Sequence, residues 1–160
     1  MDAILEHALR YVLLGWRVFP LLPGSKRPAI EAWPNQATVD RITLNQWFNG
    51  EPRNLGIATG AGSCLLILDV DPRHGGDETL AKLVDTHGPL PDTVECLTPS
   101  GGFHSYFRYP RNVAIRNSAG KLGPGLDIRA EGGYVVAPPS TLNGRRWEWE
   151  ASSDPLEATL

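Results

Sequence analysis

An apolar strand that ends in two carboxylates is the feature that most constrains this chain. Residues 65–71 read Leu-Leu-Ile-Leu-Asp-Val-Asp. Successive side chains of a strand point to opposite faces, so Asp69 and Asp71 are expected on the same face. Carboxylates this close repel each other unless a cation lies between them, and a divalent metal ion is the commonest solution. Because Mg²⁺ binds one or two carboxylates together with substrate phosphates, the run predicts metal-dependent phosphate chemistry.

Length and composition fit one ordinary globular domain. A chain of 160 residues can bury a proper core. It has no apolar run near the ~20 residues that a membrane helix needs, and its acidic first residues do not resemble a signal peptide. The cysteines, Cys64 and Cys96, are expected in strands as small buried residues, because no Cys/His cluster has zinc-site spacing. We therefore expect a cytoplasmic protein with no membrane partner.

The distribution of charge limits how nucleic acid could bind. The net charge is −3, which argues against a surface that is basic all over. Residues 1–100 carry 8 Lys and Arg against 12 Asp and Glu, whereas residues 101–160 carry 7 against 6. A local basic groove fits these counts, and so does a scattering of solvated arginines.

The order of elements predicts an α+β fold. Apolar spacing and stop signals predict helices over residues 2–14, 43–49 and 77–87. Strands are expected over residues 17–22, 54–60, 65–71, 93–98, 103–109, 125–130, 134–137 and 145–150. We expect residues 125–130 and 134–137 to pair with each other and residues 145–150 to form an edge strand. The second half of the chain should then be a largely antiparallel sheet.

Three strands predict one polar face. Alternation places His104 on one face of its strand, and Asp127 and Arg129 on one face of theirs. If these strands lie beside the strand of Asp69 and Asp71, the sheet presents three carboxylates, an imidazole and a guanidinium together. That set suits two metal ions and a triphosphate.

Each part of this set also has a simpler explanation. An Asp-x-Asp pair before proline can initiate a turn, a lone histidine can be packed or solvated, and an Asp-x-Arg pair can be a surface ion pair. Three such features on adjacent strands, each preceded by a glycine turn, favour the functional interpretation.

With these residues in place, the chain resembles a known family across nearly its whole length. It is similar to the bifunctional DNA primase/polymerase N-terminal domain of phages, plasmids and integrated elements, within the archaeo-eukaryotic primase superfamily. The resemblance rests on early segments at residues 24–28 and 54–60, and on three motifs at residues 68–71, 98–104 and 125–129, the last running into residues 132–140.

The resemblance implies a role for each site residue. Asp69, Asp71 and Asp127 would hold two divalent ions, Mg²⁺ or Mn²⁺. His104 would contact the phosphates of the incoming dNTP or NTP, and Arg129 would do likewise. The implied activity is nucleotidyl transfer to a primer 3′-hydroxyl on a DNA template.

Two further positions remain open at this level. The wider superfamily often has serine two residues before the motif histidine, where this chain has Gly102, so Ser100 or backbone N–H groups of the glycine turn would replace that hydroxyl. Lys26, in a loop framed by glycine and proline, is either a phosphate contact or a solvated lysine.

Two alternatives to a polymerase fit the residues less well. A catalytically inactive nucleotide or single-stranded DNA binding module has no reason to keep three repelling carboxylates. An Asp-x-Asp glycosyltransferase would use Asp69 and Asp71 but leave His104 and Asp127 without a role.

The resemblance also implies an architecture and partners. Residues 1–160 would form one primase/polymerase domain, with an N-terminal α/β part packed on a sheet like that of an RNA-recognition fold. We expect this domain to be the front of a longer replication protein, working with a helicase domain or protein. The preference between ribo- and deoxynucleotides stays open.

Overall fold

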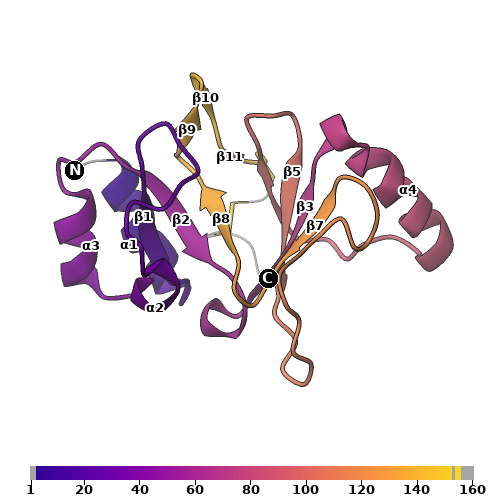
Figure 1. Ribbon diagram of the computed structural model, residues 1–160, viewed down its shortest axis with the longest axis horizontal. Coiled ribbons are helices and arrows are strands. Elements are labelled where there is room, and N and C mark those ends of the chain that lie inside the picture. The colour runs from indigo at the N-terminus through magenta and orange to yellow at the C-terminus, as the bar shows by residue number, and fades with distance from the viewer. Residues whose placement is uncertain (1–2, 153, 156–160) are drawn as a thin grey trace.

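Two antiparallel sheets organise the chain. The computed structural model describes residues 3–152 and 154–155. The smaller sheet has the order β1-β2-β8, and the larger one has the order β11-β4-β5-β3-β7-β6. Helices α1, α2 and α3 lie with the smaller sheet, and α4 lies at the far side of the larger one (Figure 1). This arrangement confirms the predicted α+β class.

The bounds of most elements follow the predicted segments, whereas α2, β6 and β9 were not predicted. The helices are α1 (Ala3–Leu13), α2 (Trp33–Gln36), α3 (Arg41–Phe48) and α4 (Gly76–His87), with short 3₁₀ turns η1 (Ala61–Ser63) and η2 (Pro72–His74). The strands of the smaller sheet are β1 (Val18–Leu21), β2 (Asn54–Ala58) and β8 (Tyr134–Ala137). Those of the larger sheet are β3 (Leu65–Val70), β4 (Val94–Leu97), β5 (Phe103–Arg108), β6 (Ser118–Ala119), β7 (Leu126–Arg129) and β11 (Glu148–Trp149). A separate hairpin joins β9 (Thr141–Leu142) to β10 (Arg145–Arg146).

Each face of β3 packs against a different layer. Leu65 and Ile67 are fully buried in the main core, which also takes in residues of α1, β1 and β2. Leu68 and Val70, on the opposite face, pack with Leu126 and with side chains of α4. Asp69 continues the face of Leu65 and Ile67 at the point where the apolar core stops. The alternation that buries β3 on both sides therefore also places its carboxylate.

The predicted pairing of residues 125–130 with residues 134–137 is wrong. Strand β7 pairs with β3 and β6, whereas β8 pairs with β2 in the other sheet. Between them the chain turns through Gly132, which has a φ of +80°, and the N–H of Gly133 donates to Ala130 O at 3.0 Å. A Cβ on Gly133 would lie 2.0 Å from Asn117 Oδ1, so a side chain there would push the Asn117 side chain aside.

The predictions for the last strand and for the two cysteines are confirmed in part. Residues 145–150 do supply an edge strand, since β11 pairs with β4, but the segment is interrupted at Trp147, which is buried. Cys96 is buried in β4 as expected. Cys64 is exposed and lies before β3 in a left-handed conformation, so its predicted burial in a strand was wrong.

Within residues 3–152 and 154–155, no helix has the length and apolar character that a bilayer span requires.

Candidate active site

Asp69 lies between His104 and Asp127 across three adjacent strands. In the register of the larger sheet, Asp69 of β3 is directly opposite His104 of β5 on one side and Asp127 of β7 on the other. Directly opposed residues in antiparallel strands project from the same face. The sheet register thus brings together the three motifs that the sequence separates by up to 58 positions.

Asp71 lies one residue beyond β3, and its backbone is held by two glycines. Its N–H donates to Gly125 O at 2.9 Å, and its carbonyl accepts from the N–H of Gly76 at 3.0 Å. A Cβ on Gly76 would lie 2.4 Å from Gly125 O, so these two segments of the backbone can approach this closely only because both residues are glycine. These contacts fix the start of η2 beside β7.

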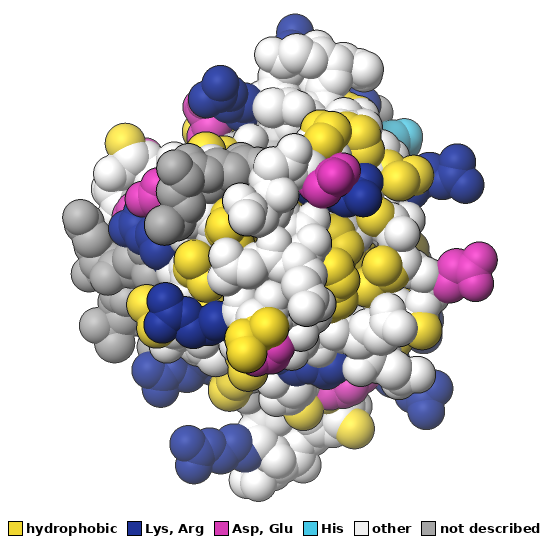
Figure 2. All heavy atoms as spheres, turned by 90° about the vertical axis from the view of Figure 1, so that its left-hand side faces the viewer, with side chains coloured by type: hydrophobic (Ala, Val, Ile, Leu, Met, Phe, Trp, Pro, Cys, Tyr) yellow, Lys and Arg dark blue, Asp and Glu magenta, His cyan; other side chains and the backbone are white. Residues whose placement is uncertain are grey.

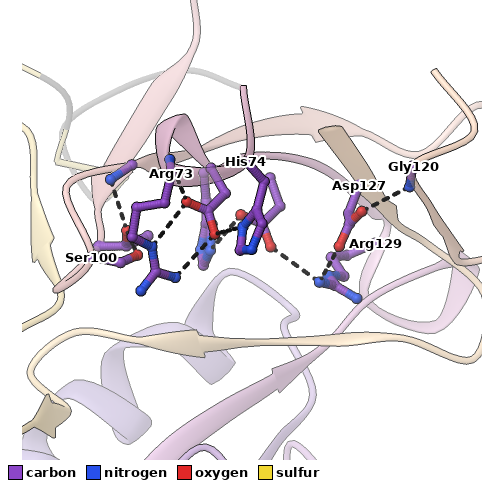
Figure 3. Close-up of polar contacts among 11 residues, drawn as sticks. Arg73, His74, Ser100, Gly120, Asp127 and Arg129 are labelled. Atoms are coloured by element: carbon purple, nitrogen blue, oxygen red, sulfur yellow. Dashed lines mark hydrogen bonds and ion pairs between the residues drawn. The ribbon is translucent and has the colours of Figure 1, made fainter. Parts of the chain in front are cut away.

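Arg129 bridges two of the carboxylates. Its Nη2 lies 3.1 Å from Asp69 Oδ2 and 2.8 Å from Asp127 Oδ2. The other oxygen of Asp127, Oδ1, accepts from the N–H of Gly120 at 2.9 Å, as Figure 3 shows. These contacts relieve the repulsion between the two opposed carboxylates.

The third carboxylate has its own cationic partner. Arg73 approaches Asp71 with two nitrogens, Nε at 3.2 Å from Oδ1 and Nη2 at 3.0 Å from Oδ2. His74 Nδ1 lies 2.9 Å from Oδ2 of the same carboxylate. Hydrogen bonding by Arg73, aided by His74 and opposed by partial burial, holds the pKa of the Asp71 carboxyl far below its usual value. Asp71 is therefore ionised at any pH near neutral.

His104 is buried and neutral. Its pKa is lowered to about 4, mainly by burial; the Asp69 charge opposes this fall, and the nearby charges of Arg129 and Lys26 add to it. Its Nε2 lies 3.5 Å from Asp69 Oδ1, which at neutral pH is a contact between an uncharged ring and a carboxylate. Among the residues that the structure describes, none hydrogen-bonds to its Nδ1. A buried ring nitrogen without a hydrogen-bond partner is unusual.

The turn before β5 explains the absence of serine at position 102. A Cβ on Gly102 would lie 2.1 Å from Val70 O, so any side chain there would collide with the backbone of β3. Ser100, two residues earlier, has its Oγ 3.1 Å from Thr98 Oγ1. The N–H groups of Gly101 and Gly102 are already bonded to the carbonyl and hydroxyl oxygens of Thr98. Of the two substitutes that the sequence left open, Ser100 is therefore the better phosphate donor.

A cleft of about 760 Å³ joins these groups. Residues from both sheets line it, including Tyr134, Val135 and Val136 of β8. It is large enough for a nucleotide, since ligand pockets commonly span about 300–1,000 Å³. Its wall contains every residue that the sequence singled out, namely Lys26, Asp69, Asp71, Ser100, His104, Asp127 and Arg129.

Lys26 reaches this cleft from the loop after β1. Its Nζ lies 5.8 Å from the centroid of the Trp147 ring, within the range of a cation–π contact. Tyr134 holds the loop through a hydrogen bond: its hydroxyl donates to Lys26 O at 2.8 Å. Lys26 is therefore an exposed residue that lies at the cleft wall.

Sequence reasoning missed several residues of the cleft. Arg73 and His74 follow the Asp-x-Asp pair after Pro72, and that proximity was the available signal. Asn117 and Trp147 come from segments with no motif and reach the cleft only through the fold. Figure 3 shows Arg73 and His74 on one side of the site and Asp127 with Arg129 on the other.

The donor set suits divalent metal ions, although its present arrangement is closed by arginines. Carboxylate oxygens are the ligands that Mg²⁺ and Mn²⁺ prefer. Within the described part of the chain, no group of three or more His, Cys, Asp or Glu side chains is arranged to hold a metal. For these carboxylates to hold an ion, the guanidinium groups of Arg73 and Arg129 would have to move aside.

Comparison with known families agrees with the fold and the motifs. A model of the bifunctional DNA primase/polymerase N-terminal domain matches residues 8–159, and the chain belongs to this family. The match confirms the resemblance that the three motifs predicted. No curated protein matches the chain significantly.

Proposed function

We propose that this domain is a DNA-dependent nucleotidyltransferase that joins dNTPs or NTPs to a primer 3′-hydroxyl on a DNA template. We assign it to replication of a phage, plasmid or integrated element. The observation that carries the proposal is the placement of Asp69 between His104 and Asp127 at the wall of a nucleotide-sized cleft. Family membership supports the same class of reaction.

Asp69, Asp71 and Asp127 are the proposed ligands of two divalent ions, Mg²⁺ or Mn²⁺. Such ions lower the pKa of an attacking hydroxyl and stabilise charge on phosphate and leaving group. The residues of the chain position the substrates: neutral His104, in the cleft wall, is the proposed contact for a phosphate oxygen. Ser100 offers a hydroxyl and Lys26 a charge at the same cleft wall.

The DNA partner is supported by a second groove that adjoins the cleft. Thr98 lines both cavities, and the second one continues between the turn at residues 97–101 and the β9–β10 hairpin. Arg145 and Arg146 are exposed on β10, and Arg145 Nη1 donates to Pro99 O at 3.3 Å. Arginine on a rigid hairpin suits phosphate contacts that position a nucleic acid strand.

Basic side chains are distributed differently on the face formed by α1, α2 and α3. Figure 2 shows Lys and Arg side chains standing apart from one another over this face and along its edge, with hydrophobic and other side chains between them. Dispersed charges of this kind do not suit a continuous phosphate backbone. We therefore place the DNA along the second groove.

Primer extension tests the proposed activity. A labelled primer on a DNA template is incubated with dNTPs or NTPs and Mg²⁺ or Mn²⁺, comparing the wild type with Asp69→Asn. Asp92→Asn, at an exposed loop position, is the matched control. Metal-dependent extension that is lost only in Asp69→Asn supports the proposal. A folded wild type that binds nucleotide but extends no primer supports the alternative of an inactive binding module.

A further inference from the structure

Each carboxylate of the candidate site is already paired with an arginine of the chain. Arg129 holds Asp69 and Asp127 at 3.1 and 2.8 Å, and Arg73 holds Asp71 through two contacts. Within residues 3–152 and 154–155, no three potential ligands are gathered around a common point. In this conformation, the guanidinium groups of Arg73 and Arg129 therefore occupy positions beside the carboxylates that divalent metal ions would need.

The charges of the site oppose the binding of a metal ion alone. The three carboxylates and the two guanidinium groups together carry one net negative charge. A divalent ion that bound without nucleotide would have to displace both arginines and would leave their charges beside it. The displaced guanidinium groups need a new anionic partner in the same cleft.

A triphosphate is that partner. Both Arg73 and Arg129 line the cleft, and their side chains are 58% and 28% exposed, so neither is locked in the core. Guanidinium binds phosphate oxygens with the same paired geometry that it uses for carboxylates. Moving from one to the other keeps each arginine paired.

We propose that Arg73 and Arg129 exchange their carboxylate partners for triphosphate oxygens when nucleotide binds, so that metal and nucleotide enter the site as a coupled unit. The inference rests on the proposed function, and it assigns Arg73 to the nucleotide site. Metal alone and nucleotide alone each meet an arrangement in which the required groups are paired with one another. When both ligands bind together, the metal ions take the carboxylates and the triphosphate takes the arginines.

The surrounding backbone allows this exchange without refolding. Gly76 and Gly125 hold the backbone of Asp71, and the N–H of Gly120 holds Oδ1 of Asp127. The register of β3 and β7 holds Asp69 opposite Asp127. Only the two arginine side chains, and the carboxylate groups that they release, need to turn.

Two binding measurements test the exchange, one for each ligand in the absence of the other. The first measures Mn²⁺ binding to the nucleotide-free protein by the electron paramagnetic resonance signal of free Mn²⁺. The second measures binding of a fluorescent dNTP analogue in EDTA. Variants Arg129→Gln and Arg73→Gln each remove one internal cation, and Asp127→Asn frees Arg129 from one partner. Arg41→Gln, at an exposed position of α3, is the matched control.

The exchange predicts tighter Mn²⁺ binding in the arginine variants and tighter nucleotide binding in the aspartate variant. Arg129→Gln and Arg73→Gln should bind Mn²⁺ alone about tenfold more tightly than wild type, a typical size for coupling between ligands. Asp127→Asn should bind the metal-free nucleotide more tightly, and Arg41→Gln should change neither affinity. Circular dichroism verifies that each variant is folded, and exposed Arg73 provides an independent variant should Arg129→Gln fail to fold.

Unchanged or weaker Mn²⁺ binding in both arginine variants overturns the exchange. So does unchanged binding of metal-free nucleotide in Asp127→Asn. Primer extension by the wild type separates the two proposals, because an active wild type with these unchanged affinities removes the exchange and leaves the proposed function intact. A wild type that binds both ligands but extends no primer removes the proposed function, whichever way the affinities change.

Discussion

Asp69 and Asp127 oppose each other directly on strands β3 and β7, and their carboxylates share one guanidinium. Two like charges in a cross-strand pair are normally destabilising. Arg129 offsets that repulsion in the protein as it stands. The pair therefore concentrates negative charge at one point of the sheet, and Arg129 shows how the fold tolerates it.

Replacing Asp127 with asparagine should abolish primer extension while leaving the fold intact. Asparagine keeps the side-chain shape and the oxygen that accepts from Gly120, but it removes a charge proposed to bind metal. Arg129 retains Asp69 as a partner, so the free energy of unfolding should change by about 1 kcal/mol or less. Primer extension and urea denaturation of the same preparation measure the two effects. Normal extension by Asp127→Asn would remove Asp127 from the metal site.

Much of the site could be predicted because strand periodicity and motif order carry the information. Asp69, His104 and Asp127 are placed by alternation along strands, and alternation is visible in the sequence. The partner of β8 could not be predicted, because a three-residue connection usually joins neighbouring strands. Here the glycine turn at residues 131–133 sends the chain to another sheet.

Contacts between side chains were less accessible to sequence reasoning. The pairing of Arg73 with Asp71 depends on the conformation of η2, which the sequence does not display as a periodic pattern. The reason for Gly102 required the distance between two strands. Local periodicity thus located the site, and tertiary structure was needed to show which charges are paired within it.

Introducing serine at position 102 should destabilise the protein rather than restore a motif. The new Cβ would lie 2.1 Å from Val70 O, and overpacking of this kind costs about 1–3 kcal/mol. For a chain of this size, each kcal/mol lowers Tm by roughly 2–4 °C. Ser100→Ala should leave Tm unchanged and raise the KM for nucleotide. Thermal melts and steady-state kinetics distinguish the two variants, and an unaltered Tm in Gly102→Ser would contradict the proposed collision.

Stability should fall as the pH is lowered from about 6.5 to about 4, partly because of His104. Its pKa is lowered from 6.5 to about 4 by burial, so the unfolded chain binds a proton in this range and the folded protein does not. The loss approaches roughly 3 kcal/mol at the lower limit, from about 1.4 kcal/mol per pH unit. Asp71, whose pKa is lowered, adds its own loss only below its usual value near 3.8. Urea midpoints at pH 7 and 4.5 should therefore differ less in His104→Gln than in wild type; equal differences would contradict a buried neutral His104.

Removing the two arginines of β10 should weaken DNA binding without affecting nucleotide binding. Arg145 and Arg146 line the groove that meets the cleft at Thr98, and neither lines the cleft itself. Loss of two phosphate contacts should reduce the slope of log K against log salt by about 1.4–1.8, since each contact contributes roughly 0.7–0.9. Fluorescence anisotropy of a labelled primer–template over a series of salt concentrations measures the slope for Arg145→Ser/Arg146→Ser. Arg10→Ser/Arg41→Ser, which removes the same charge from exposed positions of α1 and α3, is the control. An equal reduction in both double variants would show that only net charge matters, whereas a reduction confined to the β10 variant would place the DNA backbone along this groove.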